Sequence, residues 1–242
     1  MRFLLGLDDT DNLESRGTGH RARMLGLTLA EAGLAQLIGI TRHQLLVSPL
    51  IPYTSHNSSA CLELEAPAAN RGSIWQAARD FTQTDSAPGS DAGLCLADAA
   101  QAAGLKTWGQ RAKREVLQKT DALALAAEAG PWLAELTGDG GGIIGAAAGV
   151  GLRAGGSDGR YLWLPGLREL TGRLPVHEIM AQTGIGRICT PAGLDLPADA
   201  LLDVGEWLRP VLLDAIPVLL VEEDHDGNWH TLAKEDVKQR SQ

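Results

Sequence analysis

A chain of 242 residues is long enough for one large α/β domain or for two small lobes, each with a hydrophobic core. Its formal net charge of −9 speaks against a protein that coats nucleic acid with a basic surface, although a local basic cluster could still hold one nucleotide. The three cysteines lie far apart, so we expect neither a zinc ribbon nor a disulfide framework, and a reducing compartment fits them. Because the N-terminus lacks a signal-peptide pattern and the most apolar stretch, 210–221, is too short for a bilayer, we expect a cytoplasmic protein without a membrane segment.

The first part of the chain alternates predicted strands and helices. Apolar residues predict a buried strand over 2–7, and an acidic loop follows over 8–19. Apolar residues at helical spacing then predict a helix over 20–32, which Gly33 ends. The next expected elements are strands over 37–47 and 60–64 and a helix over 73–82.

The rest of the chain continues this mixture. The expected elements are, in order, helices over 97–103 and 110–119, a glycine loop over 138–142, a helix over 143–152, a strand over 160–164, a helix over 176–182, and a hairpin made by 210–221 and 228–232. Gly145, Gly149 and Gly151 predict close packing of the helix that contains them. Strands and helices mixed in this order predict an α/β or α+β fold with a mixed sheet.

Three aspartates follow the first predicted strand: Asp8, Asp9 and Asp11. A strand fixes its end, and the loop beyond it allows several carboxylates to converge. Mg²⁺ prefers hard oxygen ligands and usually keeps waters and substrate phosphates as well. The cluster therefore predicts a magnesium centre that handles a phosphoryl group. The alternative is an ordinary turn in which the acidic side chains bond to nearby backbone.

The residues after the acidic loop predict a phosphate-binding helix start. Free backbone N–H groups and the helix dipole favour an anion there, and arginines follow closely at 16, 21 and 23. Mutual surface salt bridges between these arginines and the aspartates are the alternative. The candidate nucleotide contacts in this segment are Thr10, Arg16, Gly17, Thr18 and Gly19.

His20 stands directly after this glycine-containing loop. Beside a metal-bound phosphate, a histidine could act as a general base, a phosphate ligand or a nucleophile. The alternative is that it packs at the helix start beside Met24 and Leu27, which share its face. We take His20 with the three aspartates as the candidate catalytic residues.

Two further segments are candidate nucleotide contacts. The loop residues His56, Asn57, Ser58 and Ser59 offer hydrogen bonds to a phosphate or a ribose, with a polar turn as the alternative. Gly140, Gly141 and Gly142 precede a predicted helix, where backbone N–H groups can approach an anion without a side-chain clash. No Gly-Lys-Ser/Thr follows, so this loop is not a Walker loop.

Several of these segments together resemble the archaeal tRNA(Ile) agmatinylcytidine synthetase family. FLLGLDDTD at 3–11 is similar to that family's opening G-[IL]-D-D-T-D stretch. In the same order, 47–60 resembles its LNPxIPYKTRGNGA segment, 88–96 its short Pro-Gly loop, and 140–151 its GRGLIGALAAIG segment. The resemblance covers residues 1 to about 165.

The resemblance implies a catalytic domain that uses ATP and Mg²⁺, together with a ferredoxin-like companion lobe. It implies that Asp8, Asp9 and Asp11 handle metal and phosphate. We therefore expect a synthetase-like catalytic region over 1–172 and an α/β extension of unassigned role over 173–242. That extension could shape a substrate pocket or form the contact of a homo-oligomer.

The sequence also departs from the family pattern. His20 stands at the position of a family threonine, with Thr18 two residues earlier as a possible substitute. Thr54 and His56 replace a lysine and an arginine, and Gly141 replaces another arginine. The sequence shows no counterpart of the OB-fold and zinc ribbon with which that family grips tRNA, so tRNA is a possible partner that we do not favour.

We predict an ATP- and Mg²⁺-dependent phosphotransferase or ligase that acts on a small molecule or a nucleotide. One alternative is a noncatalytic nucleotide-binding regulator, which the replaced threonine, lysine and arginines would explain. Another is a tRNA-modifying enzyme that needs a separate RNA-binding partner.

Overall fold

A computed structural model describes residues 1–53 and 56–241, so Thr54 and Ser55 of the 47–60 segment lie outside the described residues. The chain forms two compact units, Met1–Gly155 (unit 1) and the residues from Gly156 onward (unit 2). This division falls before the expected boundary at residue 172, because the strand Arg160–Trp163 pairs with Val211 inside unit 2. None of the helices in the described ranges is long and apolar enough to cross a membrane.

Unit 1 is built on an antiparallel sheet in the order β5-β4-β1-β3-β2. The strands are β1 (Arg2–Asp8), β2 (Gln36–Gln44), β3 (Ser58–Glu65), β4 (Gly93–Asp98) and β5 (Trp132–Glu135). Helices α1 (Thr18–Glu31) and α2 (Arg71–Asp85) connect β1 to β2 and β3 to β4. This βαββαβ order with β1 and β3 in the centre is the ferredoxin-like arrangement, here extended by β5. The predicted mixed α/β fold is confirmed.

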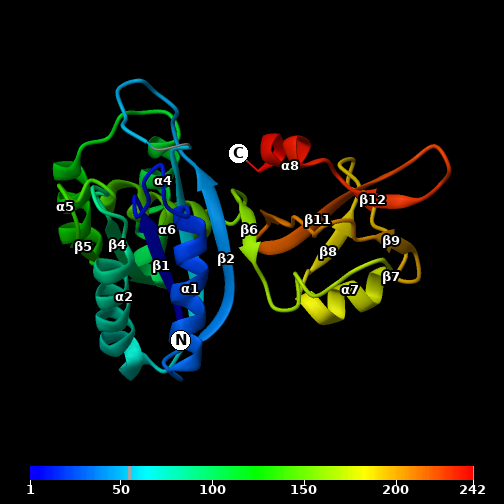
Figure 1. Ribbon diagram of the computed structural model, residues 1–242, viewed down its shortest axis with the longest axis horizontal. Coiled ribbons are helices and arrows are strands. Elements are labelled where there is room, and N and C mark those ends of the chain that lie inside the picture. Colours follow the sequence, from blue (N-terminus) through cyan, green and yellow to red (C-terminus); the bar gives the residue numbers. More distant parts are fainter. Residues whose placement is uncertain (54–55, 242) are drawn as a thin grey trace. The chain divides into compact units, whose positions relative to one another are not determined.

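Helices cover both faces of this sheet (Figure 1). Helix α1 packs on the face that carries Leu62, because a Cβ atom at Gly26 would meet the Leu37 and Leu62 side chains. The opposite face is covered by α6 (Ile143–Gly155). Unit 1 is completed by a short 3₁₀ turn (Ala68–Asn70) and by α3 (Ala99–Gly104), α4 (Lys106–Ala112) and α5 (Lys119–Ala129).

Glycines allow α6 to lie directly on the strands. A Cβ atom at Gly6 of β1 would be 2.0 Å from the carbonyl oxygen of Ala146, and one at Gly93 would be 2.1 Å from the nitrogen of Ile143. On the helix itself, a Cβ atom at Gly151 would be 2.1 Å from the carbonyl oxygen of Leu105. The predicted close packing of this glycine-rich helix is confirmed, and it holds the N-terminal end of α6 against the ends of β1 and β4.

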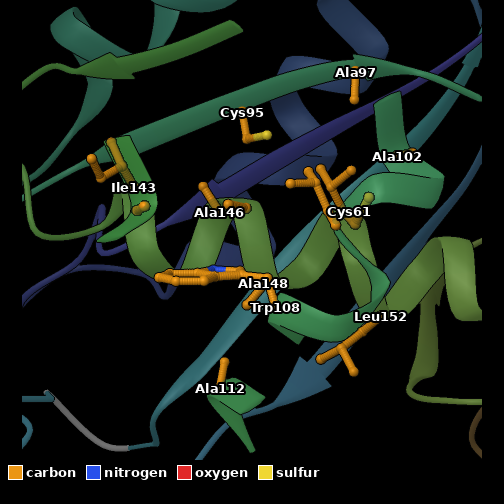
Figure 2. Packing of buried hydrophobic residues seen from close by; sticks show 14 of the residues in the cluster. Cys61, Cys95, Ala97, Ala102, Trp108, Ala112, Ile143, Ala146, Ala148 and Leu152 are labelled. Atoms are coloured by element: carbon orange, nitrogen blue, oxygen red, sulfur yellow. The ribbon is translucent and has the colours of Figure 1, made fainter. Parts of the chain in front are cut away.

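The core between α6 and the sheet consists mainly of small side chains. Figure 2 shows Cys61 and Cys95 from the strands near Ala146 of α6. Trp108 of α4 packs against the same helix, and its indole N–H donates to the carbonyl of Ile144 at 3.1 Å. Burial raises the pKa of the Cys61 thiol to about 12, so this thiol is protonated at neutral pH.

Unit 2 is a smaller mixed unit with its own core, in which Tyr161, Ile179 and Leu219 are buried. Its strands pair in the order β6-β10-β11-β12-β9-β7, and β8 pairs with β11 in parallel. The strands are β6 (Arg160–Trp163), β7 (Arg173–Pro175), β8 (Arg187–Cys189), β9 (Leu201–Asp203), β10 (Val211–Leu213), β11 (Ile216–Glu223) and β12 (Trp229–Thr231). Its helices are α7 (Val176–Thr183) and α8 (Lys234–Arg240) (Figure 1).

Most predicted elements are confirmed, and two differ. The segment 210–221, expected as one arm of a hairpin, is divided into β10 and β11, which pair with each other, and only β11 forms the expected hairpin with β12. The helix expected over 110–119 does not form, because α4 ends at Ala112 and α5 starts at Lys119. The segment between them is held by tertiary contacts: Leu117 is buried in the core, and the carbonyl of Ala112 accepts a hydrogen bond from the N–H of Leu46 at 3.0 Å. Tertiary packing here overrides the local helix propensity.

Candidate functional site

A cavity of about 360 Å³ opens in unit 1 at one end of the sheet. The strand register explains why distant segments meet there. Asp8 at the end of β1 pairs with Gly93 at the start of β4, and Gly93 pairs with Glu135 at the end of β5. On the other side of β1, Leu7 pairs with Ala60 near the start of β3. The loops that leave these four strand ends therefore all border the same space.

Carboxylates dominate one part of the cavity wall. Asp8, Asp9 and Asp11 come from the loop after β1, Asp91 from the loop before β4, and Asp139 from the loop after β5. Their charges lie close enough to perturb one another. Burial, followed by repulsion from Asp91, Asp11 and Asp139, raises the pKa of Asp9 to about 6.

Asp8 is perturbed in the same direction. Burial is the main cause that raises its pKa well above the usual value, and the neighbouring charge of Asp9 adds to it. The Asp8 carboxylate lies against α6, since a Cβ atom at Gly145 would be 1.7 Å from its Oδ2 atom. Asp9 has a φ of 52°, a left-handed conformation that non-glycine residues adopt rarely and that aspartate tolerates better than most. Strained backbone of this kind concentrates at functional sites.

A chain of hydroxyl groups positions Asp11. The hydroxyl of Thr18 at the start of α1 donates to Asp11 Oδ1 at 2.7 Å, and the hydroxyl of Thr10 donates to that of Thr18 at 3.0 Å. Thr10 and Thr18 are both buried. The acidic loop is thereby tied to the helix that follows it, and Thr18 orients a carboxylate at the cavity.

The glycine loop before α6 is fixed by a second network. The backbone N–H of Asp139 donates to Asp91 Oδ1 at 2.7 Å, and Asp139 Oδ1 accepts from the N–H of Gly141 at 2.7 Å. Lys119 of α5 donates to Glu135 Oε2 at 2.8 Å and also to the backbone carbonyl of Asp139. These contacts place Gly141 and Gly142 at the cavity wall, directly before the N-terminus of α6.

Besides the polar lining residues His56, Asn57, Ser58, Glu115 and Gln118, the wall has an apolar part. It includes Leu45, Leu50, Ile51, Pro52, Val116, Leu117 and Ile144, together with Tyr53. Leu50 and Tyr53 are among the exposed large side chains. A cavity with one acidic and one apolar part suits a ligand that has a ring system and a group carrying metal or positive charge.

The donor set fits a divalent cation that arrives with a phosphate-bearing ligand. Within residues 1–53 and 56–241, no group of three or more His, Cys, Asp or Glu side chains converges closely enough to hold a metal by itself. Mg²⁺ needs only one or two carboxylates when waters and phosphates complete its shell. Five aspartates, two of them with pKa values raised partly by mutual repulsion, are a favourable partner for such a cation.

The cavity brings together only part of the predicted site. Of the predicted residues, its lining includes Asp8, Asp9, Asp11, His56, Asn57, Ser58, Gly141 and Gly142. Those that do not line it are Thr10, Arg16, Gly17, Thr18, Gly19, His20, Ser59 and Gly140. His20 follows Thr18 by two residues, about 200° around the helix, so the two side chains leave α1 in nearly opposite directions. Burial, followed by the charges of Arg16 and Arg23, lowers the pKa of His20.

Sequence reasoning missed Asp91, Asp139 and Lys119. The available signal was weak: Asp91 and Asp139 are single acidic residues in polar loops, and Lys119 ends a predicted helix that does not form. The fold and the cavity together define the class of protein: a ferredoxin-like α/β unit with an aspartate-rich ligand site at one end of its sheet.

Comparison with known proteins identifies this fold more closely. No family model and no curated protein matches the chain. Among solved structures, the complex of TiaS with an isoleucine tRNA and ATP is similar with a TM-score of 0.56 and 26% identity, over 62% of this chain and 36% of that chain. Apo TiaS, an agmatidine synthetase of that tRNA, has a TM-score of 0.54 and 25% identity over 62% and 35% of the two chains. A tRNA fluorescent labeling enzyme has a TM-score of 0.56 and 27% identity over 62% and 36%.

The chain therefore contains a TiaS-like region, which confirms the resemblance read from the sequence. It spans about a third of the length of the structures it matches.

Proposed function

We propose that this protein is an ATP- and Mg²⁺-dependent enzyme of the TiaS kind, and that its acceptor is a nucleotide of a tRNA. The observation that carries the proposal is the convergence of Asp8, Asp9, Asp11, Asp91 and Asp139 with Gly141 and Gly142 around one cavity of a TiaS-like fold. The similar structures include complexes of TiaS with tRNA and ATP, and with tRNA, AMPCPP and agmatine.

The charge of the cavity supports a ligand that brings its own cation. Among the described lining residues, Lys119 is the one side chain with a full positive charge at neutral pH, and it is already paired with Glu135. A bare triphosphate would be repelled by the aspartates. A magnesium–nucleotide complex would be attracted, because the metal neutralises the phosphates and offers positive charge to the carboxylates.

Each part of the wall has a role in the proposal. Asp9, with at most one of Asp91 and Asp139, is the proposed magnesium contact, and Asp8 and Asp11 orient the bound complex. The backbone N–H groups near Gly142, at the start of α6, bind phosphate oxygens. When bound, magnesium supplies charge neutralisation for the phosphoryl group that leaves ATP.

The acceptor assignment revises the preference for a small molecule that the sequence suggested. The tRNA named in the similar structures favours a nucleotide of an RNA chain, with a small amine as a further substrate. The apolar part of the cavity, which includes the exposed Leu50 and Tyr53, provides a surface for a nucleobase.

The proposal is tested by nucleotide turnover with and without RNA. Wild-type protein is incubated with ATP labelled at the γ-phosphate, Mg²⁺ and total tRNA, and the release or transfer of label is measured. We expect magnesium-dependent turnover that tRNA stimulates and that Asp9→Asn lowers at least about 100-fold, as for the loss of a group that stabilises transition-state charge.

The matched control is Asp80→Asn, which removes an exposed carboxylate of α2 that does not line the cavity. It should retain wild-type turnover. ATP binding without turnover under any RNA condition would favour a noncatalytic nucleotide-binding protein. Turnover unaffected by magnesium removal and by Asp9→Asn would refute the proposed site.

A further inference from the structure

Unit 2 carries an aromatic and arginine cluster that has no part in the proposed ATP site. Trp207, in the loop between β9 and β10, is 43% exposed. The guanidinium carbon of Arg168 lies 4.9 Å from its ring centroid, and that of Arg209 lies 5.3 Å from it. We name these three residues the Trp207 cluster.

The loops that present the Trp207 cluster are anchored in the core. Val204 and Leu208 flank Trp207 in the sequence and are fully or almost fully buried. Leu167 and Leu170 flank Arg168 in the same way and belong to the same core cluster. An exposed indole on such fixed loops is a preorganised contact surface, since little side-chain or loop freedom is lost when a ligand binds.

Two arginine–tryptophan pairs in unit 1 have similar geometry, but their guanidinium groups are bound by neighbouring side chains. Arg71 lies over Trp132 at 4.3 Å, and it is held by Gln101 at 2.7 Å and Asp98 at 3.5 Å. Arg111, which lies 5.9 Å from the Trp108 ring, is paired with Glu115 at 2.9 Å. In both pairs a nearby side chain already receives the guanidinium N–H groups.

Arg209 is less well neutralised. The carboxylate recorded beside it is Glu206 at 3.8 Å, whose side chain is 91% exposed. At that distance, and with Glu206 in solvent while the Arg209 side chain is 18% exposed, the pairing is weak. Arg160 also lies close enough for its pKa to be lowered by burial first and then by the charge of Arg209. Two guanidinium groups, those of Arg168 and Arg209, thus lie at one exposed indole, and Arg160 lies near Arg209, where the charge of Glu235 also acts on it.

This gathering contrasts with the charge of the rest of the unit. Residues 156–242 contain eight Lys and Arg and fourteen Asp and Glu. A unit of that charge repels polyanions over most of its surface, so a polyanion would bind only where the arginines concentrate. Guanidinium groups bind phosphates, and aromatic rings and guanidinium planes stack on unpaired bases.

We propose that the Trp207 cluster is a binding site for single-stranded RNA, in which an unpaired base stacks on the cluster and Arg209 contacts the adjacent phosphate. Planar bases and phosphates in one chain match the planar and cationic groups of the cluster, whereas an acidic peptide supplies only the charge. The site lies outside the ATP cavity and does not depend on the proposed reaction.

The test is fluorescence anisotropy of the full chain with a labelled unstructured RNA of about eight nucleotides, within the site sizes of single-strand binders, in the absence of ATP. We expect Trp207→Ala to weaken binding at least about fivefold, as for the loss of one stacked base. Arg209→Gln should weaken it and reduce the slope of log Kd against log salt by up to about one. Trp207→Phe should retain most of the affinity.

Trp132→Ala is the matched control, because it removes the other partly exposed, arginine-stacked tryptophan. It should bind as wild type. Circular dichroism checks folding, and if Trp207→Ala does not fold, Trp207→Phe and Arg209→Gln decide the question. Lack of RNA binding by the wild type, equal loss in Trp132→Ala, or equal competition by polyglutamate or by double-stranded RNA would overturn the proposal. Because ATP is absent from this assay, these outcomes are separate from a failure of the ATP site.

Discussion

Gly145 is the position where one methyl group should disable the proposed nucleotide site. Its Cβ atom in Gly145→Ala would lie 1.7 Å from Asp8 Oδ2 and 2.7 Å from Asp8 Cγ. Neither distance is tolerable, so the Asp8 carboxylate must leave its place beside α6. Because Asp8 borders Asp9 and Asp11, the displacement rearranges the acidic end of the cavity.

The expected effects on stability and on binding are of similar size, so the two are measured separately. Alanine in place of glycine inside a helix gains up to about 1 kcal/mol, and overpacking costs about 1–3 kcal/mol. The net loss of unfolding free energy therefore lies between about 0 and about 3 kcal/mol. The loss of one well-placed charged contact corresponds to about 1.5–3 kcal/mol, so binding of magnesium–ATP should weaken roughly 10- to 100-fold.

Isothermal titration calorimetry with magnesium–ATP measures the binding, and thermal unfolding measures the stability. Gly155→Ala is the matched control in the same helix, because a Cβ atom there has nothing within 4 Å. It should bind as wild type and be equally or slightly more stable. Equal affinities of Gly145→Ala and Gly155→Ala would refute the role assigned to Asp8 and to its contact with α6.

Three further predictions concern the fold and its titratable groups. Glu63→Leu should lower the free energy of unfolding by about 3 kcal/mol in denaturant titrations, because it removes the carboxylate that pairs with the buried Arg153; an unchanged midpoint would contradict this. In metal-free buffer, the free energy of unfolding should fall by about 1–2 kcal/mol as pH rises from about 4 to 6, a range that allows for partial solvent screening of Asp9. The reason is that folded Asp9 keeps its proton up to a pKa of about 6, whereas the unfolded chain loses it near 3.8. Asp9→Asn should make that slope shallower without removing it, because the raised pKa of Asp8 contributes in the same direction, and an unchanged slope would assign it to groups other than Asp9. Cys61 should react with thiol reagents at neutral pH only as fast as the chain opens, because burial raises its pKa to about 12; rapid labelling of the folded protein would show that the core is open.

The sequence predicted the parts of the fold that local pattern specifies. The apolar run before Asp8 and the small residues after Gly142 correctly indicated β1 and α6, because burial on two faces and close packing each leave a compositional signature. Three of the five cavity aspartates could also be found from local pattern, because they stand together at the end of one strand.

The remaining site residues depend on strand order, which local pattern does not contain. Asp91 and Asp139 reach Asp9 only because β4 pairs with β1 and β5 pairs with β4, so that their loops leave the same end of the sheet. His20 was a good candidate in linear sequence, yet the period of α1 turns it away from the direction of Thr18. Spacing along a loop was a poor guide to position once the helix had begun.

In the proposed complex, the aspartates at the end of β1 hold magnesium and a nucleotide against the start of α6. A crystal structure of the full chain with Mg²⁺ and a nonhydrolysable ATP analogue would show this arrangement or exclude it. We expect phosphate oxygens near the backbone of Gly141 and Gly142, with the metal bound by Asp9 and at most one further aspartate of the cavity. A nucleotide bound elsewhere in the chain, or phosphates in this cavity without a metal beside the aspartates, would contradict it.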